Sequence, residues 1–323
     1  MVPIRNSLCT FAAAIAMFTA VAEAQDRASN GQDSPEAMRH LAAARQAGGD
    51  DWVQAVDFLC GRNPDPGNRR ESPVLDPTWM FDDFAVLGHA GTVVYVLNTS
   101  EGIILIDSGY PGEEESILLA GLAQLGLDPE DVRYVIVSHG HADHFGGARF
   151  MQERYGARVA LSAADWDLME QRRGNNPIPT RDVVLAEGQP VVLGDKAVTP
   201  VHIPGHTPGA LGLIFPVNDG GNRHMVGLFG GIISGIGDIS DEVLDQYVRS
   251  VGHFAEVSED MAVDVEIHNH PIFDGMYGRL EQLAARRAGT PNPFVVGASA
   301  YQGLLDVMTE CIAVQRARRA AAN

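Results

Sequence analysis

From residue 84 onward, the chain alternates short apolar runs with turn-forming residues. The runs at 92–97 and 103–107 flank a polar segment, 98–102, that ends in glycine, and this pattern predicts a β-hairpin. A run at 84–87 predicts a strand before the hairpin. Later runs predict strands at 132–137, 157–161, 183–185, 191–193, 196–203, 211–217, 224–229 and 262–267.

Stretches with helical spacing of apolar residues separate the predicted strands. Between residues 113 and 126, Ile117, Leu118, Leu122 and Leu125 fall on one face of an amphipathic helix. Ser162 is the expected N-cap of a helix that runs to residue 171. Further helices are expected at 241–254, 277–287 and 297–319. Two blocks of strands that each close with helices predict one α/β (α+β) domain, in which two sheets pack together between outer helices.

The first 24 residues have the pattern of a secretory signal peptide. Arg5 precedes an apolar segment at 8–22 that is short for a bilayer span, and Ala22-Glu23-Ala24 is a small-x-small cleavage site. A buried N-terminal helix is the alternative. We expect cleavage after Ala24, a periplasmic or secreted protein, and no membrane partner for the mature form. Residues 25–78 would then be an N-terminal extension, and 79–323 the main domain.

Two cysteines, Cys60 and Cys311, would remain after cleavage. In an oxidising compartment an even number permits one disulfide, which would tie the extension to the last helix; two buried free thiols are the alternative. Ser34, Pro35 and Glu36 predict the start of a helix in the extension. Residues 57–78, rich in Pro, Gly, Asn and Arg, predict an extended segment over the core.

The composition narrows the classes of partner. Of the 323 residues, 45% are hydrophobic and 20% charged, which are values typical of a globular protein with a large core. The formal net charge is −19, so nucleic acids and anionic membranes would be repelled. A small-molecule substrate is therefore the expected partner, and the composition leaves the oligomeric state open.

The chemistry is concentrated directly after the predicted strand 132–137. There the chain offers His139, His141, Asp143 and His144 within six positions, before a predicted helix start. Solvated loop histidines are the ordinary alternative, but four side chains that can bind metal favour a site, because loops at the carboxyl ends of strands are where sites are built in open α/β sheets.

Two later loops offer further ligands. His206 lies between Pro204 and Pro208, and His270 precedes Pro271, so both loops are stiffened by proline. We expect two sites for Zn²⁺, two ions per chain, because nitrogen and carboxylate donors with an open position suit catalytic zinc. The first would be held by His139, His141 and His206, and the second by Asp143, His144 and His270.

Neighbouring polar residues have less certain roles. His268 lies two positions before His270 and is the alternative ligand. Asp107 follows a predicted strand and is placed to orient a metal-bound histidine through a hydrogen bond. His89 could line the site, although a surface position is the simpler expectation.

These motifs resemble those of the metallo-β-lactamase fold superfamily. The resemblance rests on His139-Gly140-His141-Ala142-Asp143-His144, on Gly205-His206-Thr207-Pro208-Gly209 and on His270-Pro271, with Asp107 matching the early Asp of the superfamily. It extends from about residue 84 to the C-terminus. It implies a four-layer αββα sandwich with a dinuclear zinc site at the edge of the sheets.

One position distinguishes subgroups of this superfamily. Glyoxalase II-type thioesterases, lactonases and related hydrolases place a bridging Asp at a strand end between the equivalents of His206 and His270, and one group of β-lactamases places Cys there. Residues 228–234 contain neither, and Asp238 comes several positions late. The chain therefore resembles subclass B3 metallo-β-lactamases, whose second zinc takes Asp, His and His.

The resemblance implies a zinc-dependent β-lactamase. A zinc-bound hydroxide would open the β-lactam amide, Asp143 would bind the second zinc and help to hold the attacking water, and Ser234 would contact the substrate. Where subclass members commonly have a first serine, this chain has Ile232. That departure concerns the substrate, so a hydrolase of another ester, lactone or thioester is the alternative. A secreted, non-catalytic zinc-binding or structural domain is a separate, third hypothesis.

Overall fold

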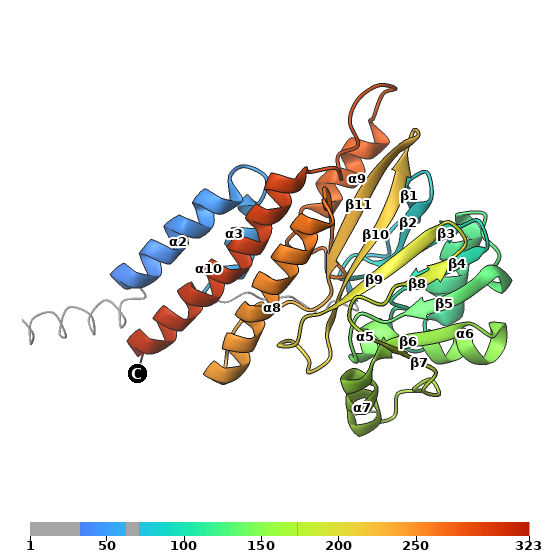
Figure 1. Ribbon diagram of the computed structural model, residues 1–323, viewed down its shortest axis with the longest axis horizontal. Helices are drawn as coiled ribbons and strands as arrows, with labels where there is room; N and C mark the ends of the chain where they lie inside the picture. The colour runs from blue at the N-terminus through green and yellow to red at the C-terminus, as the bar shows by residue number, and fades with distance from the viewer. Residues whose placement is uncertain (1–32, 63–70, 173, 323) are drawn as a thin grey trace, which may run out of the picture.

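Two β-sheets pack face to face in the computed structural model, which describes residues 33–62, 71–172 and 174–322 (Figure 1). The seven-stranded sheet has the order β1-β2-β3-β4-β5-β6-β7, and the five-stranded sheet has the order β12-β11-β10-β9-β8. The strands of the first sheet are β1 (Thr78–Phe81), β2 (Phe84–His89), β3 (Thr92–Thr99), β4 (Gly102–Ile106), β5 (Val132–Ile136), β6 (Arg158–Ser162) and β7 (Val183–Leu185). Those of the second are β8 (Val191–Leu193), β9 (Lys196–His202), β10 (Leu211–Asp219), β11 (Asn222–Phe229) and β12 (Val265–Ile267).

The first sheet is antiparallel from β1 to β4 and parallel from β4 to β7. Strands β3 and β4 form the predicted hairpin, and β2 pairs with β3 along its other edge. In the second sheet β12 pairs with β11 in parallel, whereas β8 to β11 are antiparallel. Because β5 and β12 are both followed by loops at their carboxyl ends, each sheet can deliver side chains to a common edge.

Three apolar clusters confirm the αββα order of layers. Phe84, Tyr95 and Phe215 belong to the cluster between the sheets. A second cluster packs helices onto the first sheet, through residues such as Leu122 and Trp166. These helices are α4 (Ala120–Gln124), α5 (Ala142–Phe145), α6 (Ala148–Tyr155) and α7 (Ala163–Arg172). The third cluster covers the second sheet with α2 (Pro35–Gly48), α3 (Val53–Leu59), α8 (Asp241–Asp260) and α10 (Ala298–Ala322), and α9 (Met276–Ala284) packs against the cluster between the sheets.

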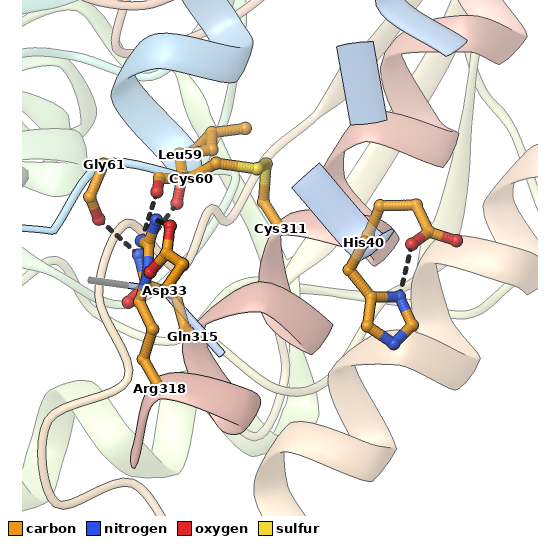
Figure 2. The surroundings of a disulfide bond; sticks show 9 residues. Asp33, His40, Leu59, Cys60, Gly61, Cys311, Gln315 and Arg318 are labelled. Atoms are coloured by element: carbon orange, nitrogen blue, oxygen red, sulfur yellow. Dashed lines mark hydrogen bonds and ion pairs between the residues drawn. A yellow bond between two sulfur atoms is a disulfide. The ribbon is translucent and has the colours of Figure 1, made fainter. Parts of the chain in front are cut away.

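The N-terminal extension is bound to the C-terminal helix. Helix α2 lies beside α10 (Figure 1), and its predicted start is confirmed, since the Ser34 hydroxyl accepts the N–H of Ala37. A disulfide joins Cys60, at the end of α3, to Cys311 in α10 (Figure 2). Of the two alternatives for these cysteines, the disulfide is therefore the one present, and not two free thiols. Arg318 of α10 pairs with Asp33. The extension is therefore part of the outer helical layer.

Several predicted elements differ from the structure in detail. The segment expected to be a single helix at 113–126 starts with a π-helical stretch, Glu114–Leu119, before α4. The strand expected at 262–267 is shorter, Val265–Ile267, and its expected first residue, Ala262, has a φ of 53°, which an extended strand cannot include. Strand β1 and helix α3 were not predicted, and α3 replaces the start of the segment expected to be extended.

Some predictions concern residues outside the described part. The predicted signal peptide, residues 1–24, lies there, as does the 63–70 portion of the extension. Among the residues that the structure describes, no helix combines the length and the apolar character needed to cross a membrane.

Candidate metal centre

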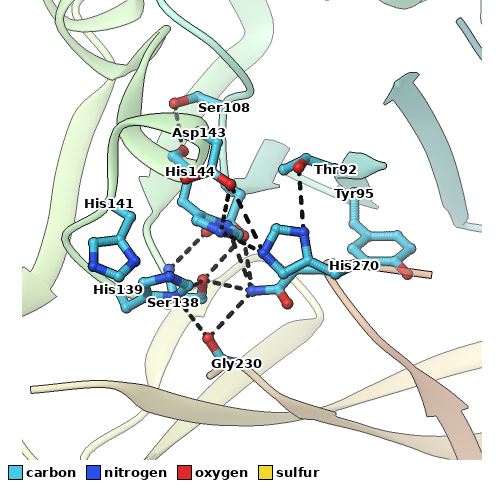
Figure 3. Close-up of polar contacts among 12 residues, drawn as sticks. Thr92, Tyr95, Ser108, Ser138, His139, His141, Asp143, His144, Gly230 and His270 are labelled. Carbon is cyan, nitrogen blue, oxygen red and sulfur yellow. Dashed lines mark hydrogen bonds and ion pairs between the residues drawn. The ribbon is translucent and has the colours of Figure 1, made fainter. Parts of the chain in front are cut away.

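Three loops from both sheets meet at one edge of the sandwich. The loop after β5 carries His139, which follows the buried Ser138, and His141, and the short helix α5 that comes next carries Asp143 and His144. The loop between β9 and β10 carries His206. The loop after β12 carries His270, which Figure 3 shows facing the β5 loop.

The first triad consists of His139, His141 and His206, whose ligand atoms all lie within 4.8 Å of one another. The Nε2 atom of His206 lies 3.2 Å from Nε2 of His139 and 3.2 Å from Nδ1 of His141. His139 is buried, and the other two are half-buried. The triad thus joins one loop of each sheet and remains partly open to solvent.

The second triad consists of Asp143, His144 and His270, again with ligand atoms within 4.8 Å of one another. The Nε2 atoms of His144 and His270 lie 3.1 Å apart, and Oδ2 of Asp143 lies 3.5 Å from Nε2 of His144. Both histidines are buried, whereas Asp143 is half-buried. The rings of His139 and His144 are 4.0 Å apart between centroids, so the two triads are adjacent.

Oxygen acceptors behind three of the histidines orient their rings. Nδ1 of His139 lies 2.7 Å from the Gly230 carbonyl oxygen, and Nδ1 of His144 lies 2.7 Å from Oδ2 of Asp107. Nδ1 of His270 lies 2.9 Å from the Gly91 carbonyl oxygen. An Nδ1–H donated to each acceptor leaves the Nε2 lone pair facing the triad, which is the tautomer that a metal ligand needs.

The charge state of His139 also suits a ligand. Burial, followed by the neighbouring histidines His144 and His206, holds the pKa of His139 well below its usual range. The imidazole is therefore neutral around pH 7, and a neutral imidazole is the form that binds metal. Neutral histidines with one carboxylate in two triads fit zinc, whose usual ligands they are.

Asp107 lies where the sequence placed it, directly after β4 and behind a candidate ligand (Figure 3 shows the ligand, His144). It is buried, and its carboxylate also accepts the N–H of Ser138 at 2.7 Å. Its φ is 61°, in the left-handed region, which non-glycine residues rarely adopt. The buried hydrogen bonds hold this backbone, and the carboxylate connects β4 to the loop after β5.

His268 takes part in neither triad. Its Nδ1 accepts the backbone N–H of His270 at 2.9 Å, and burial lowers the pKa of His268 to about 3. It is a buried, neutral support for the loop. His270, the residue preferred in the sequence analysis, is the one that faces Asp143 and His144.

His89 is buried, so the expectation of a surface position is wrong. Its Nε2 lies 2.8 Å from a carboxylate oxygen of Glu113, and its Nδ1 lies 3.0 Å from the Ser72 carbonyl oxygen. These acceptors lie on segments that are distant in sequence, which is why periodicity did not reveal the burial.

Asp238 is exposed in the loop after β11, as expected of a loop residue.

Ser234 is half-buried in the loop that follows β11 and joins neither triad. Its role in substrate binding, like the assignment of the six triad residues as ligands, stays a prediction.

The sequence analysis missed two residues that support the histidines. Asn269 donates to Ser138 Oγ at 3.0 Å and to the Gly230 carbonyl at 3.2 Å, and Thr92 lies 3.2 Å from Nδ1 of His270. The proximity of Asn269 to His270 was the only signal available.

The comparison with a family model agrees with this geometry. Residues 87–219 match the model of the metallo-beta-lactamase superfamily. The crystal structure of BJP-1, a subclass B3 metallo-beta-lactamase of Bradyrhizobium japonicum, is similar over 79% of this chain and 98% of its own, with a TM-score of 0.65 and 25% identity. In sequence over residues 87–219 and in fold over most of its length, the chain is similar to the metallo-β-lactamase superfamily. The members of this superfamily are metal-dependent hydrolases, and the αββα fold predicted from the motifs is confirmed.

Curated relatives within the superfamily differ in activity. A hydroxyacylglutathione hydrolase of Acidiphilium cryptum is 38% identical over 82 residues, which are 25% of this chain and 30% of the relative. An exodeoxyribonuclease of Bacillus anthracis is 31% identical over 117 residues, 36% of this chain and 42% of the relative. The chain thus spans less than half the length of these two relatives. Similarity to this superfamily does not select the substrate, and the absence of a nucleic acid partner stays a prediction.

Proposed function

We propose that this protein is a zinc-dependent hydrolase that opens the amide of β-lactams. The observation that carries the proposal is the pair of adjacent triads, each with three donors, in a fold that matches a subclass B3 metallo-beta-lactamase over nearly its whole length. His139, His141 and His206 would hold one zinc, and Asp143, His144 and His270 the other. When bound, the ions would supply a hydroxide at neutral pH and polarise the carbonyl oxygen of the substrate.

The residues around the ions have distinct tasks in this proposal. The Asp143 carboxylate is the half-buried member of the second triad, so it is placed to accept a hydrogen bond from an attacking water. The Gly230 carbonyl, Asp107 and the Gly91 carbonyl fix the imidazoles behind the ligands. Because the half-buried His141 and His206 form the outer side of the site, substrate would approach from there.

The strand end after β11 favours this subgroup over hydrolases with a bridging carboxylate. A Cβ atom on Gly230 would lie 2.2 Å from the Leu211 carbonyl oxygen and 2.8 Å from Cβ of Ser138. Such distances leave no room for a side chain, so an aspartate cannot replace Gly230 without moving β10. At Gly230 itself, the backbone therefore leaves no room for a bridging carboxylate.

A second candidate is the hydrolysis of an ester, lactone or thioester by the same two triads. The similarity to a hydroxyacylglutathione hydrolase favours it, as does the apolar Ile232 at a position where subclass B3 members commonly have serine. As part of the first candidate function, we propose that the protein is exported from the cytoplasm. Export is supported by the apolar segment before Ala24 and by the disulfide between Cys60 and Cys311, a bond typical of oxidising compartments.

A hydrolysis screen separates the candidates. Zinc-loaded protein would be incubated with nitrocefin, a penicillin, a carbapenem, and ester, lactone and thioester substrates, each with and without a chelator. The proposal expects β-lactam turnover that the chelator abolishes and that His206→Ala lowers severely. Intact β-lactams beside turnover of another substrate would establish the second candidate, and zinc-loaded protein without any turnover would leave the non-catalytic domain.

A further inference from the structure

A buried carboxylate outside both triads connects the two loops of the first triad. Asp165 is the third residue of α7, a helix that contributes no candidate ligand, and its side chain is fully buried. Its backbone N–H donates to Oγ of Ser162, 3.2 Å away, which confirms the predicted N-cap and fixes the first turn. The position of the carboxylate is thus set by the start of the helix.

The carboxylate accepts hydrogen bonds from both ligand loops. Its Oδ2 lies 2.8 Å from the N–H of Gly140, the residue between His139 and His141. The same oxygen accepts the hydroxyl of Thr207, the residue after His206, at 2.6 Å, and Oδ1 accepts the N–H of Gly209 at 2.7 Å. One side chain therefore bonds to the chain beside all three members of the first triad.

The approach of α7 to these loops is as close as the backbone allows. A Cβ atom on Gly209 would lie 2.1 Å from Oγ of Ser162 and 2.7 Å from the backbone nitrogen of Asp165. The second glycine of the Gly205-His206-Thr207-Pro208-Gly209 turn is thus explained by the helix start that packs on it. Hydrogen bonds to a buried carboxylate are short and strong, so this contact holds the two loops at a fixed spacing.

We propose that Asp165 is a positioning residue that sets the distance between His206 and the pair His139 and His141, and thereby the zinc affinity of the first triad. The inference rests on the proposed binding of metal, but not on the choice of substrate. The second triad is held by other groups, since Asp107 and the Gly91 carbonyl contact His144 and His270. Loss of Asp165 therefore weakens one zinc site and spares the other.

The test measures zinc rather than turnover. Wild-type protein and Asp165→Asn would be titrated with zinc in competition with a chromophoric chelator, and their metal content measured after dialysis. Both carboxylate oxygens of Asp165 accept hydrogen bonds from donors. In the variant, an amide NH₂ group replaces one of these oxygens, so a donor then faces a donor. We expect the first site to lose about 10–100-fold in affinity, as for loss of an outer partner, while the second keeps its wild-type affinity.

Double variants identify the site that is emptied. In a His206→Ala background, where the first triad is already broken, Asp165→Asn should have no additional effect on zinc binding. In a His270→Ala background, it should remove most of the remaining zinc. Asp167→Asn is the matched control on the same helix, because this carboxylate is exposed and pairs with Arg181 at the surface.

The possible outcomes separate this inference from the proposed function. Wild-type zinc affinity at both sites of Asp165→Asn would overturn the inference, and so would an equal loss at both. If Asp165→Asn does not fold, Thr207→Val removes one of the three donors, and a loss confined to the first site then supports the inference while unchanged affinity overturns it. Wild-type protein that binds two zinc ions but hydrolyses no β-lactam would refute the proposed substrate alone.

Discussion

The two triads differ in burial and in what holds them. In the second triad, both histidines are buried, and a carboxylate bonds directly to one ligand, since Oδ2 of Asp107 lies 2.7 Å from Nδ1 of His144. In the first triad, two histidines are half-buried, and the carboxylate of Asp165 bonds to the backbone and a hydroxyl beside the ligands. Two buried aspartates therefore support the two sites by different routes.

The difference shows how one edge of a sandwich provides both rigidity and access. A buried ligand can be fixed by a direct hydrogen bond, because the surrounding side chains exclude water. A half-buried ligand keeps one side for the substrate, so its loop is fixed from behind instead. The position of the first triad thus depends on helix α7, and that of the second triad on the end of β4 and the start of β3.

The largest expected effect comes from removing one ligand of each triad. His206→Ala and His270→Ala should each lose one of the two zinc ions, and hydrolysis should fall by more than the roughly 10–100-fold that an outer partner costs. His270→Ala should also destabilise the metal-free protein by about 1–3 kcal/mol, because it leaves buried polar groups at Thr92 and Gly91 without their His270 partner. The half-buried His206 should cost less. Metal analysis and urea unfolding test both points, and equal destabilisation would contradict the difference in burial.

The next effect tests the two aspartates against each other. Asp107→Asn should weaken zinc binding at the second triad by about 10–100-fold and affect the first less, because Asp107 bonds directly to His144 but reaches His139 through Ser138. Asp165→Asn should act mainly on the first triad. Asparagine is the suitable substitution, because it tolerates the φ of 61°, whereas alanine would add roughly 1–2 kcal/mol of backbone strain. Zinc titration of the two variants side by side is the measurement. If both variants emptied the same site, the separate support of the triads would be disproved.

The smallest effect concerns two buried carboxyl groups on either side of His270 in the chain. Glu266 in β12 and Asp274 are buried close to Arg279, which donates to Glu266 Oε2 at 3.0 Å. Burial, and then Asp274, raises the pKa of Glu266 above its usual value of 4.5, although Arg279 opposes the shift. The folded protein thus binds a proton that the unfolded chain has released, and stability falls as the pH rises from the usual value through the raised one.

Glu266→Gln should reduce this pH dependence, and the part due to the buried Asp274, whose pKa is raised to about 6, should remain. Between about pH 5 and pH 8, the wild type should lose at most about 1.4 kcal/mol of unfolding free energy per pH unit from this group, and the variant should lose less. Urea unfolding at several pH values, in one metal state, gives both slopes. The exposed Glu259→Gln serves as the control with a wild-type slope. Parallel slopes for wild type and Glu266→Gln would show that the carboxyl is ionised throughout.

Much of the fold followed from local patterns. Apolar runs placed most of the strands of both sheets, because each strand is buried on at least one face and alternates with turn residues. The π-helical stretch before α4 and the burial of His89 depend on segments that meet only in the folded chain. Strand β1 and helix α3 are short, and their sequences lack the periodicity that identified the longer elements.

The sequence by itself determined which six side chains are candidate ligands, which segments carry them and which superfamily the chain resembles, since ligand types and their spacing are local properties of a chain. The tertiary structure decided which donors meet. It separated His268 from His270, set Asp107 behind His144, and brought Asp165 between two loops that are more than sixty residues apart. Those relations depend on the stacking of two sheets and on a helix start that fits against glycine, and no residue carries that information alone.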